Sequence, residues 1–388
     1  MNSSPSPSNS SRFEGCTLTG ALSVLTEIRD AVCVIHGPSG CAHHNFSLLH
    51  ATLLSNDRLE VPRLLSTRLT EKDIIFGGEE ALESSIARAL SLSPAPSSVF
   101  VLSTCIVETI GDDTAAVSAK AWGVPVIAVP TAGFLGGVFE TGVRNALSSA
   151  ALLAESARER TLSANLIGEK NLEYGVDENA AEIVRLLARL GIGINLRFVR
   201  GIATGDIGRL GSAAVNILRE PALRPVGEDL KRRFSTPFVD SFPVGLAGTC
   251  RFLADIGRIC GVDASAAIEE EQAFQREMLS RFADLEGSRV CFRSPHSMLE
   301  GDPAAEAVLA ECAIALDLAV DPDGTPIPLP YPAPVGTAGV RRMLNRWRVQ
   351  IRGEGGGDGA SLRSGYRPPC AGGQRQGCGN CGSGGEIR

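Results

Sequence analysis

Three cysteines each stand where a backbone turn meets a helix-like stretch, and their thiols are the side chains best suited to hold a metal cluster. Cys16 begins Cys-Thr-Leu-Thr-Gly, Cys41 ends His-Gly-Pro-Ser-Gly-Cys, and Cys105 follows Ser-Thr. The amides of a helix start stabilise a thiolate, which is the form of cysteine that ligates iron. This arrangement predicts an iron–sulfur cluster at the edge of a parallel sheet.

These three cysteines do not supply all the ligands of the cluster. A 4Fe-4S cluster takes four ligands, and a second subunit, the carboxylate of Asp112 or a tail cysteine could supply the fourth. The sequence favours none of these sources. Gly40 is also expected to bind the cofactor, because glycines 37 and 40 let the backbone bend tightly before Cys41.

The catalytic candidates are titratable side chains close to these cysteines. His43 follows Cys41 at the same helix start and could donate protons near neutral pH. Glu108 and Asp112 follow Cys105 and could donate protons, ligate the cluster or dock a partner. Each has a simpler interpretation, since histidines on an exposed helix turn are common at surfaces, and Asp112-Asp113 directly precedes a helix that it could cap.

The remaining cysteines are expected to be structural or to lie in a flexible tail. A buried cysteine behaves as a small hydrophobic side chain. This role is expected of Cys33, Cys250, Cys260, Cys291 and Cys312. The tail contains Cys370, Cys378 and Cys381, and the CxxC spacing of the last two could bind zinc or a second cluster. Because the surrounding sequence is rich in glycine, flexibility is the preferred interpretation.

The composition indicates a globular protein and disfavours several function classes. The 388 residues are 44% hydrophobic and 21% charged, and no apolar run approaches the roughly 18 residues that cross a bilayer. The formal charge of -7 offers no basic surface to a phosphate backbone, so we expect neither a nucleic-acid nor a membrane partner. The polar N-terminus lacks a secretory signal, and eleven cysteines then indicate reduced thiols and a cytoplasmic location.

Apolar runs alternate with amphipathic stretches, which predicts an α/β fold of successive Rossmann-like domains with parallel sheets. After a disordered segment at 1–12, the first domain covers 13–163 and is expected to bind the cluster. Its strands are expected at 31–36, 98–104 and 124–129, and its helices at 18–28, 79–92 and 114–122.

Two further domains and a tail are expected. The second Rossmann-like domain covers 164–263, with helices at 177–190 and 207–218 and strands at 193–199 and 238–241. A linking helix at 264–285 and a reduced third domain cover 264–352, with a strand at 289–293 and helices at 303–315 and 336–351. The proline-rich stretch 321–334 is expected to be an extended connector, and 353–388 a flexible tail rich in glycine and cysteine.

Three segments carry a resemblance to a known family. They are His-Gly-Pro-Ser-Gly-Cys at 36–41, Ser-Thr-Cys-Ile-Val-Glu-Thr-Ile-Gly-Asp-Asp at 103–113, and Ser-Phe-Pro-Val-Gly at 241–245. With them the chain resembles the component 1 proteins of nitrogenases and nitrogenase-like reductases over most of residues 13–350. The resemblance implies that Cys16, Cys41 and Cys105 ligate a 4Fe-4S cluster.

Within this family, the sequence around Cys16 and Cys41 most resembles that of the catalytic component of Ni-sirohydrochlorin a,c-diamide reductive cyclase. This is an enzyme of coenzyme F-430 biosynthesis in methanogens. The resemblance implies a homodimer that receives electrons from a nitrogenase-reductase-like iron–sulfur ATPase. That partner would use the ATP, since this chain contains no Gly-x-x-x-x-Gly-Lys phosphate-binding loop.

The substrate implied by the resemblance is a nickel tetrapyrrole. It would be reduced by six electrons and closed into a ring at a side-chain amide. Two alternatives remain: a nitrogenase-like reductase of another substrate, such as a small organosulfur compound, and a non-catalytic scaffold for metal-cluster assembly.

Overall fold

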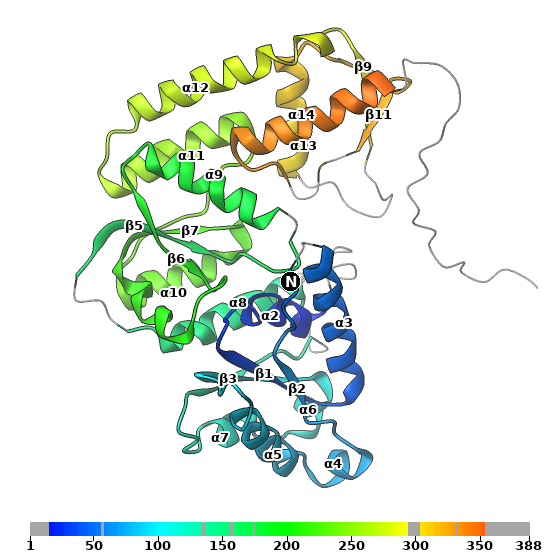
Figure 1. Cartoon of the computed structure of the whole chain (residues 1–388), viewed down its shortest axis with the longest axis vertical. Coiled ribbons are helices and arrows are strands. Elements are labelled where there is room, and N and C mark those ends of the chain that lie inside the picture. Colours follow the sequence, from blue (N-terminus) through cyan, green and yellow to red (C-terminus); the bar gives the residue numbers. More distant parts are fainter. Residues whose placement is uncertain are drawn as a thin grey trace, which may run out of the picture.

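Three parallel sheets follow one another along the chain, and their domains are arranged as a column (Figure 1). The computed structural model describes residues 15–55, 58–133, 137–155, 159–173, 175–293, 303–328, 330 and 333–353. The segment 1–12 and the tail with Cys370, Cys378 and Cys381 lie outside the described residues. The predicted α/β class is confirmed.

The first sheet has four parallel strands in the order β2-β1-β3-β4. The strands are β1 (Ala31–His36), β2 (Leu64–Ser66), β3 (Ser98–Ser103) and β4 (Val126–Val129). The helices are α2 (Thr17–Leu25), α3 (Ser39–Ser55), α4 (Glu71–Phe76), α5 (Glu79–Leu90), α6 (Cys105–Ile110), α7 (Thr114–Ser118) and α8 (Phe139–Ala150), followed by the 3-10 turn η1 (Ala151–Leu153). The α7 helix ends at Ser118 and is thus shorter than expected.

Both faces of this sheet are covered. Ile35 of β1 belongs to the core that includes α2 and α8, whereas the adjacent Val34 belongs to the core that includes α5. A strand buried on both faces is a continuous apolar run. This is why the sequence alone located β1 and β3.

The second sheet repeats the arrangement in the order β6-β5-β7-β8. Its strands are β5 (Thr161–Ile167), β6 (Gly193–Phe198), β7 (Ala213–Leu218) and β8 (Phe238–Val239). Its helices are α9 (Val176–Ala188), α10 (Arg224–Phe234) and α11 (Gly245–Cys260), with 3-10 segments η2 (Thr204–Ser212) and η3 (Pro221–Leu223). Because β5 begins at Thr161, the domain boundary expected at 164 would cut through a strand.

The helix expected at 207–218 is wrong. Its first part is the 3-10 segment η2 and its second part is β7, which lies between β5 and β8. Ile217 belongs to the core of the second domain, and Leu218 belongs to the core shared with the first. Burial on both faces of an interior strand overrides the weak helical periodicity of so short a segment.

The third sheet is small, with three parallel strands in the order β10-β9-β11. The elements of this domain are α12 (Ser265–Ser280), η4 (Ala283–Leu285), β9 (Arg289–Arg293), α13 (Pro303–Ala315), β10 (Ala319–Val320), β11 (Thr325–Pro328) and α14 (Gly336–Gly353). The expected connector at 321–334 therefore contains β11, which pairs with β9. Helix α14 returns to contact α9 and α11 of the second domain.

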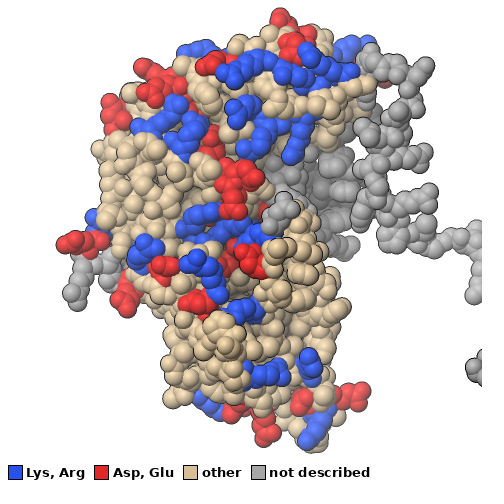
Figure 2. Space-filling view, viewed as in Figure 1, with Lys and Arg blue, Asp and Glu red and all other residues tan. Residues whose placement is uncertain are grey.

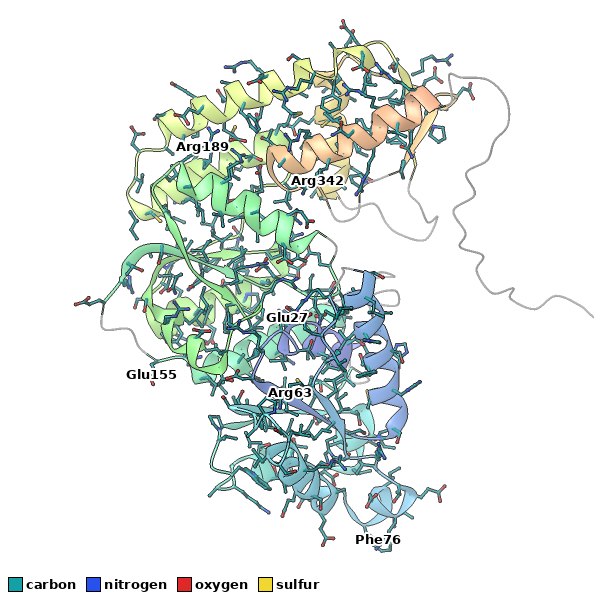
Figure 3. All side chains as sticks on the ribbon, viewed as in Figure 1. Glu27, Arg63, Phe76, Glu155, Arg189 and Arg342 are labelled. Atoms are coloured by element: carbon teal, nitrogen blue, oxygen red, sulfur yellow. The ribbon has the colours of Figure 1, made fainter. Side chains whose placement is uncertain are left out.

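A buried carboxylate ties the first two domains together. Glu27 follows α2 and accepts hydrogen bonds from Arg58 Nη1 at 2.9 Å and from Arg200 Nη1 at 3.2 Å. Arg200 also donates to Asp177 at 3.1 Å, at the start of α9. Figure 3 shows Glu27 between the two domains. The paired charges replace the hydration that Glu27 loses on burial.

Charged side chains are unevenly distributed on the face shown in Figure 2. Lys, Arg, Asp and Glu gather over α12 and α14 and across the middle of the molecule, whereas much of the first domain carries little charge in this view. None of the helices in the described part of the chain is long and apolar enough to cross a membrane.

The backbones of α2 and α8 touch where the helices cross. A Cβ atom on Gly142 would overlap the carbonyl group of Thr17, and one on Gly20 would overlap the carbonyl group of Phe139. Only glycine allows this approach. The crossing places the start of α2, and therefore Cys16, against the rest of the domain.

Gly142→Ala is expected to lower the free energy of unfolding by about 2 kcal/mol, because the added methyl group forces α2 and α8 apart. Urea denaturation followed by circular dichroism measures the change. The matched control is Gly208→Ala, since a Cβ there meets nothing within 4 Å. Equal stability of the two variants would contradict the importance of the crossing.

Candidate functional site

Each of the three cysteines lies at the start of a helix. Cys16 immediately precedes α2, Cys41 lies in the first turn of α3, and Cys105 is the first residue of α6. Helix α3 follows β1 and α6 follows β3, and these strands are neighbours. The chain goes from β1 to β2 on one side and then crosses from β2 to β3 on the other side of β1. Open α/β sheets bind ligands in the crevice at such a point.

The three thiols act on one another electrostatically. Burial raises the pKa of the Cys41 thiol, and the charges of Cys16 and Cys105 raise it further. Cys16 is exposed, while Cys41 and Cys105 are half-buried. Three thiolates that repel one another are stabilised by a positive centre between them, which cluster iron provides. The structure thus places the three predicted ligands near enough to influence one another's charge, and their binding of an iron–sulfur cluster stays a prediction.

A single metal ion fits the three thiols less well than a cluster does. Within the ranges that the structure describes, no three His, Cys, Asp or Glu side chains lie close enough to share one ion. In a 4Fe-4S cluster each thiolate binds a different iron, so the sulfur atoms stand farther apart. The expected alternative ligands Cys370, Cys378 and Cys381 are outside the described residues.

A close backbone contact fixes the relative positions of Cys41 and Cys105. A Cβ atom on Gly37 would overlap the side chain of Thr104, and Thr104 N donates to His36 O at 3.0 Å. The turns after β1 and β3 therefore touch. The buried hydroxyl of Thr104 has no hydrogen-bond partner among the described residues.

Gly40 has a different environment from Gly37. It lies inside α3, where the backbone is helical, and nothing lies within 4 Å of the position of a Cβ. The expectation that Gly40 is needed to bend the chain is therefore wrong. The open space beside it is compatible with a bound cofactor, and that role stays a prediction.

A buried histidine that the sequence did not single out lies at the same edge of the first sheet. His36 ends β1, and its Nε2 donates to Asp112 Oδ2 at 3.0 Å while its Nδ1 lies 3.2 Å from Thr67 Oγ1. Gly78 N also donates to Asp112, at 3.1 Å. The sequence feature that could have pointed to His36 is a polar residue at the end of an apolar strand.

The three predicted catalytic residues occupy different places. Asp112 is almost fully buried and is held by the two contacts just described, which favours a structural role. Glu108 accepts a hydrogen bond from Ser103 Oγ at 2.6 Å, at the end of β3. His43 is exposed and lines a hollow of about 600 Å³ between α3 and β2. The structure therefore does not bring these side chains together, and their catalytic roles stay predictions.

The expected capping role belongs to Asp113. Its side chain accepts a hydrogen bond from Ala116 N at 2.8 Å at the start of α7.

A larger cleft lies between the three domains. Its volume is about 840 Å³, within the usual range for small-molecule sites. Leu48 and Thr52 of α3 line it, as do Phe139 of α8 and Val308 of α13. The second domain contributes the turns that follow β5, β7 and β8. Sequence reasoning missed these residues because they come from distant segments of the chain.

A family model described as nitrogenase component 1 type oxidoreductase matches residues 16–299, which include all three cysteines. The chain belongs to this family. Its members bind iron–sulfur clusters, form oligomers and work with reductase-like partners.

Curated relatives share about three residues in ten with this member of the family. The nitrogenase iron-molybdenum cofactor biosynthesis protein NifE of Clostridium pasteurianum is 30% identical over 70% of this chain and 61% of its own length. One component of the light-independent protochlorophyllide reductase of Bradyrhizobium sp. (strain BTAi1) is 30% identical over 67% of this chain and 52% of its own length. The chain thus spans between half and two thirds of these relatives.

The fold is also that of a solved nitrogenase protein. The structure titled Nitrogenase Cp1 at pH 6.5 superimposes with a TM-score of 0.62 at 22% identity, covering 82% of this chain and 62% of that one. The Rossmann-like, nitrogenase component 1-like architecture expected from the sequence is confirmed.

Replacing Cys105 with alanine is expected to remove most of the bound iron and the broad visible absorption of the cluster, because a ligand is lost at the start of α6. The fold should be retained, since Cys105 is only half-buried. Iron analysis and absorption spectra of the anaerobically purified protein measure both properties.

The control is Cys260→Ala, because Cys260 is also half-buried but ends α11 in the second domain. It should keep its iron. Similar iron content in the two variants would refute the assignment of Cys105 as a ligand.

His36 predicts a pH dependence of stability. Burial lowers its pKa below the ordinary value of 6.5, although Asp112, Glu79 and Asp73 oppose this. Below about pH 6.5 the unfolded chain therefore binds a proton that the folded chain does not, and stability falls with falling pH.

The non-titrating variant His36→Gln should lose less stability than the wild-type protein between about pH 7.5 and pH 5.5. Urea unfolding at both pH values provides the comparison. An equal loss in the two proteins would mean that His36 keeps its ordinary pKa when folded.

Proposed function

We propose that this chain is the catalytic component of a nitrogenase-like reductive cyclase. It takes electrons from an ATP-hydrolysing iron–sulfur reductase and passes them through a 4Fe-4S cluster held by Cys16, Cys41 and Cys105. The substrate is Ni-sirohydrochlorin a,c-diamide, which undergoes a six-electron reduction and lactam closure on the route to coenzyme F-430.

The observation that carries this proposal is the connection between the thiols and the central cleft. Helix α3 begins with Cys41 in its first turn and lines the cleft with Leu48 and Thr52. Helix α8 lines the cleft with Phe139 and crosses α2, which follows Cys16. Electrons that enter at the thiols therefore have a short path to a ligand in the cleft.

The cleft has the size and walls that a tetrapyrrole needs. Phe139, Phe242 and Val308 provide apolar surface for a flat ring, and charged side chains at the ends of β5 and β7 suit its carboxylate edge. One relative, by its name, reduces protochlorophyllide, which is also a tetrapyrrole. This likeness supports a macrocyclic substrate.

The residues of the chain have separate tasks in the proposed reaction. A bound cluster would supply single electrons at low potential. The three cysteines would hold it at the edge of the first sheet, where Cys16 is exposed. The cleft orients the substrate between the domains and removes part of it from water.

Exposed apolar side chains support the proposed partners. Ile75 and Phe76 at the end of α4 are 72% and 80% exposed, and Figure 3 shows Phe76 at the tip of the first domain. Helix α4 contacts α6, which begins at Cys105, so a reductase bound there would be close to the thiols. Leu54 near the end of α3 is exposed and suits a second copy of the chain.

Cofactor biosynthesis is a second candidate, favoured by the likeness to NifE. In that case the chain would be a scaffold on which a metal cluster is assembled and passed on. Reduction of a different substrate by the same electron path is a third.

The test combines the cluster-loaded protein with the reductase partner, ATP, a low-potential reductant and Ni-sirohydrochlorin a,c-diamide. The absorption of the pigment is expected to change only when all components are present, because reduction shortens its conjugated system. A Cys41→Ala variant should give no change, since a cluster ligand is lost.

Other results would contradict the cyclase proposal. An unchanged pigment spectrum with a fully loaded cluster would reject it. Transfer of the cluster to an acceptor protein without turnover would support the scaffold instead.

A further inference from the structure

One face of α11 forms a wall of the central cleft. Val244, Ala247, Gly248 and Arg251 line the cleft, and residues three or four apart lie on the same face of a helix. The opposite face of α11 carries the buried residues of the helix. Among the four residues of this wall, Arg251 is the charged one.

The cations at the ends of β5 and β7 also line the cleft, but carboxylates compensate them. Arg219 Nη2 donates to Glu173 Oε1, and its guanidinium lies 4.5 Å from the centre of the Phe242 ring. Lys170 Nζ donates to both carboxylate oxygens of Glu220, at 3.1 and 3.2 Å. These two ion pairs give the cleft polar surface without an unpaired positive charge.

Arg251 stands apart from these pairs. Its exposed guanidinium makes no ion pair or hydrogen bond with any residue that the structure describes. The charge of Arg251 acts on Asp255, one turn further along α11. Asp255 takes its hydrogen bonds from other residues, namely Ser241 Oγ at 2.7 Å and Arg258 Nη2 at 2.9 Å. The N–H donors of Arg251 are therefore available to a ligand.

The other carboxylates of the cleft do not compensate Arg251. Glu311 of α13 accepts hydrogen bonds from two backbone amides at the start of α11, at 2.8 and 2.6 Å. Asp240 is paired with Arg224. Glu140 lies on α8, in the wall that the first domain contributes. On the wall formed by α11, the positive charge of Arg251 is thus left for a ligand.

Gly248 leaves open space one turn before Arg251. Among the described residues, a Cβ atom there would meet only the carbonyl carbon of Pro243, at 4.0 Å. The packing of the protein therefore does not require glycine, although glycine inside a helix is less favourable than alanine. A ligand that lies against the backbone of α11 would account for the missing side chain.

We propose that α11 recognises the substrate: Arg251 pairs with a carboxylate at the edge of the macrocycle, and the ring lies against Gly248. The inference rests on the proposed function, because it concerns the same tetrapyrrole. A guanidinium offers two parallel N–H donors to a carboxylate. An uncharged edge would take water from Arg251 without replacing its hydrogen bonds, so Arg251 discriminates against such a ligand.

The test compares Ni-sirohydrochlorin a,c-diamide with the same pigment after methylation of its carboxylates. Binding of each to the cluster-loaded protein without reductant is measured by absorption titration. Arg251→Gln is expected to weaken binding of the carboxylate form about 20-fold, since a charge-assisted pair is lost. Binding of the ester should change by no more than about twofold. Arg251→Lys keeps the charge and should recover part of the loss.

Two further variants complete the comparison. Arg258→Gln is the matched control, because Arg258 lies on the same helix, is 69% exposed and does not line the cleft. It should bind both pigments as the wild-type protein does. Gly248→Ala should weaken both pigments alike, by about 10-fold, because its methyl group fills space and removes no charge. Its thermal unfolding midpoint should not fall, since the methyl group meets open space.

The outcomes separate this inference from the proposed function. Equal binding of the carboxylate form by the wild-type and Arg251→Gln proteins overturns the role of Arg251 and leaves the cyclase intact. An equal loss of both pigments in that variant also overturns it, since Arg251 would then support the fold of the cleft. Unchanged binding by Gly248→Ala overturns the placement of the ring.

The proposed function can fail by itself. A wild-type protein that binds the pigment through Arg251, but leaves it unreduced when the cluster, the reductase and ATP are present, overturns the cyclase and supports this inference. A wild-type protein that binds neither pigment overturns both.

Discussion

The contact between the turns after β1 and β3 is the constraint on which the rest of the site depends. Gly37 and Thr104 meet so closely that a side chain on the glycine cannot fit. Cys41 and Cys105 follow these turns, Cys41 in the first turn of α3 and Cys105 as the first residue of α6. Their separation is therefore set by backbone geometry before any cluster binds, and the buried pair of His36 and Asp112 holds the two turns in place. Such preorganisation reduces the entropy lost when a ligand is bound.

The same topology is used twice for different chemistry. In the first sheet, thiols lie at the crevice beside β1. In the second sheet, ion pairs lie at the crevice beside β5. Helices α3 and α8 belong to the first domain but line the cleft beside the second sheet. Electron entry and substrate binding can then be optimised separately, because each depends on its own set of turns. The proposed reaction needs both, since every electron pair must meet protons at the same bond.

The sequence predicted what short apolar runs and local turns determine. Segments such as 31–36 and 98–104 were located because interior parallel strands are apolar on both faces. The helix starts at Cys16 and Cys41 followed from glycine turns, and the one at Cys105 followed from the end of the apolar run 98–104. The helix expected at 207–218 was wrong because pairing with β5 and β8, which no local pattern records, decides that β7 is a strand. The ion pair of Glu173 and Arg219 was equally hidden, since two strands must first align before these residues meet.

Helix α14 makes the second domain depend on a segment that is made after the third sheet. Ala338 N donates to Glu182 Oε1 at 3.1 Å across a separation of 156 residues, and α14 contacts both α9 and α11. Contacts of such high sequence separation require a long loop to close before they contribute. During synthesis, the surface of α9 that faces α14 stays uncovered until the whole third domain has been made. The third domain therefore completes the cover of the second, because α14 packs in the core of the third domain and also contacts α9.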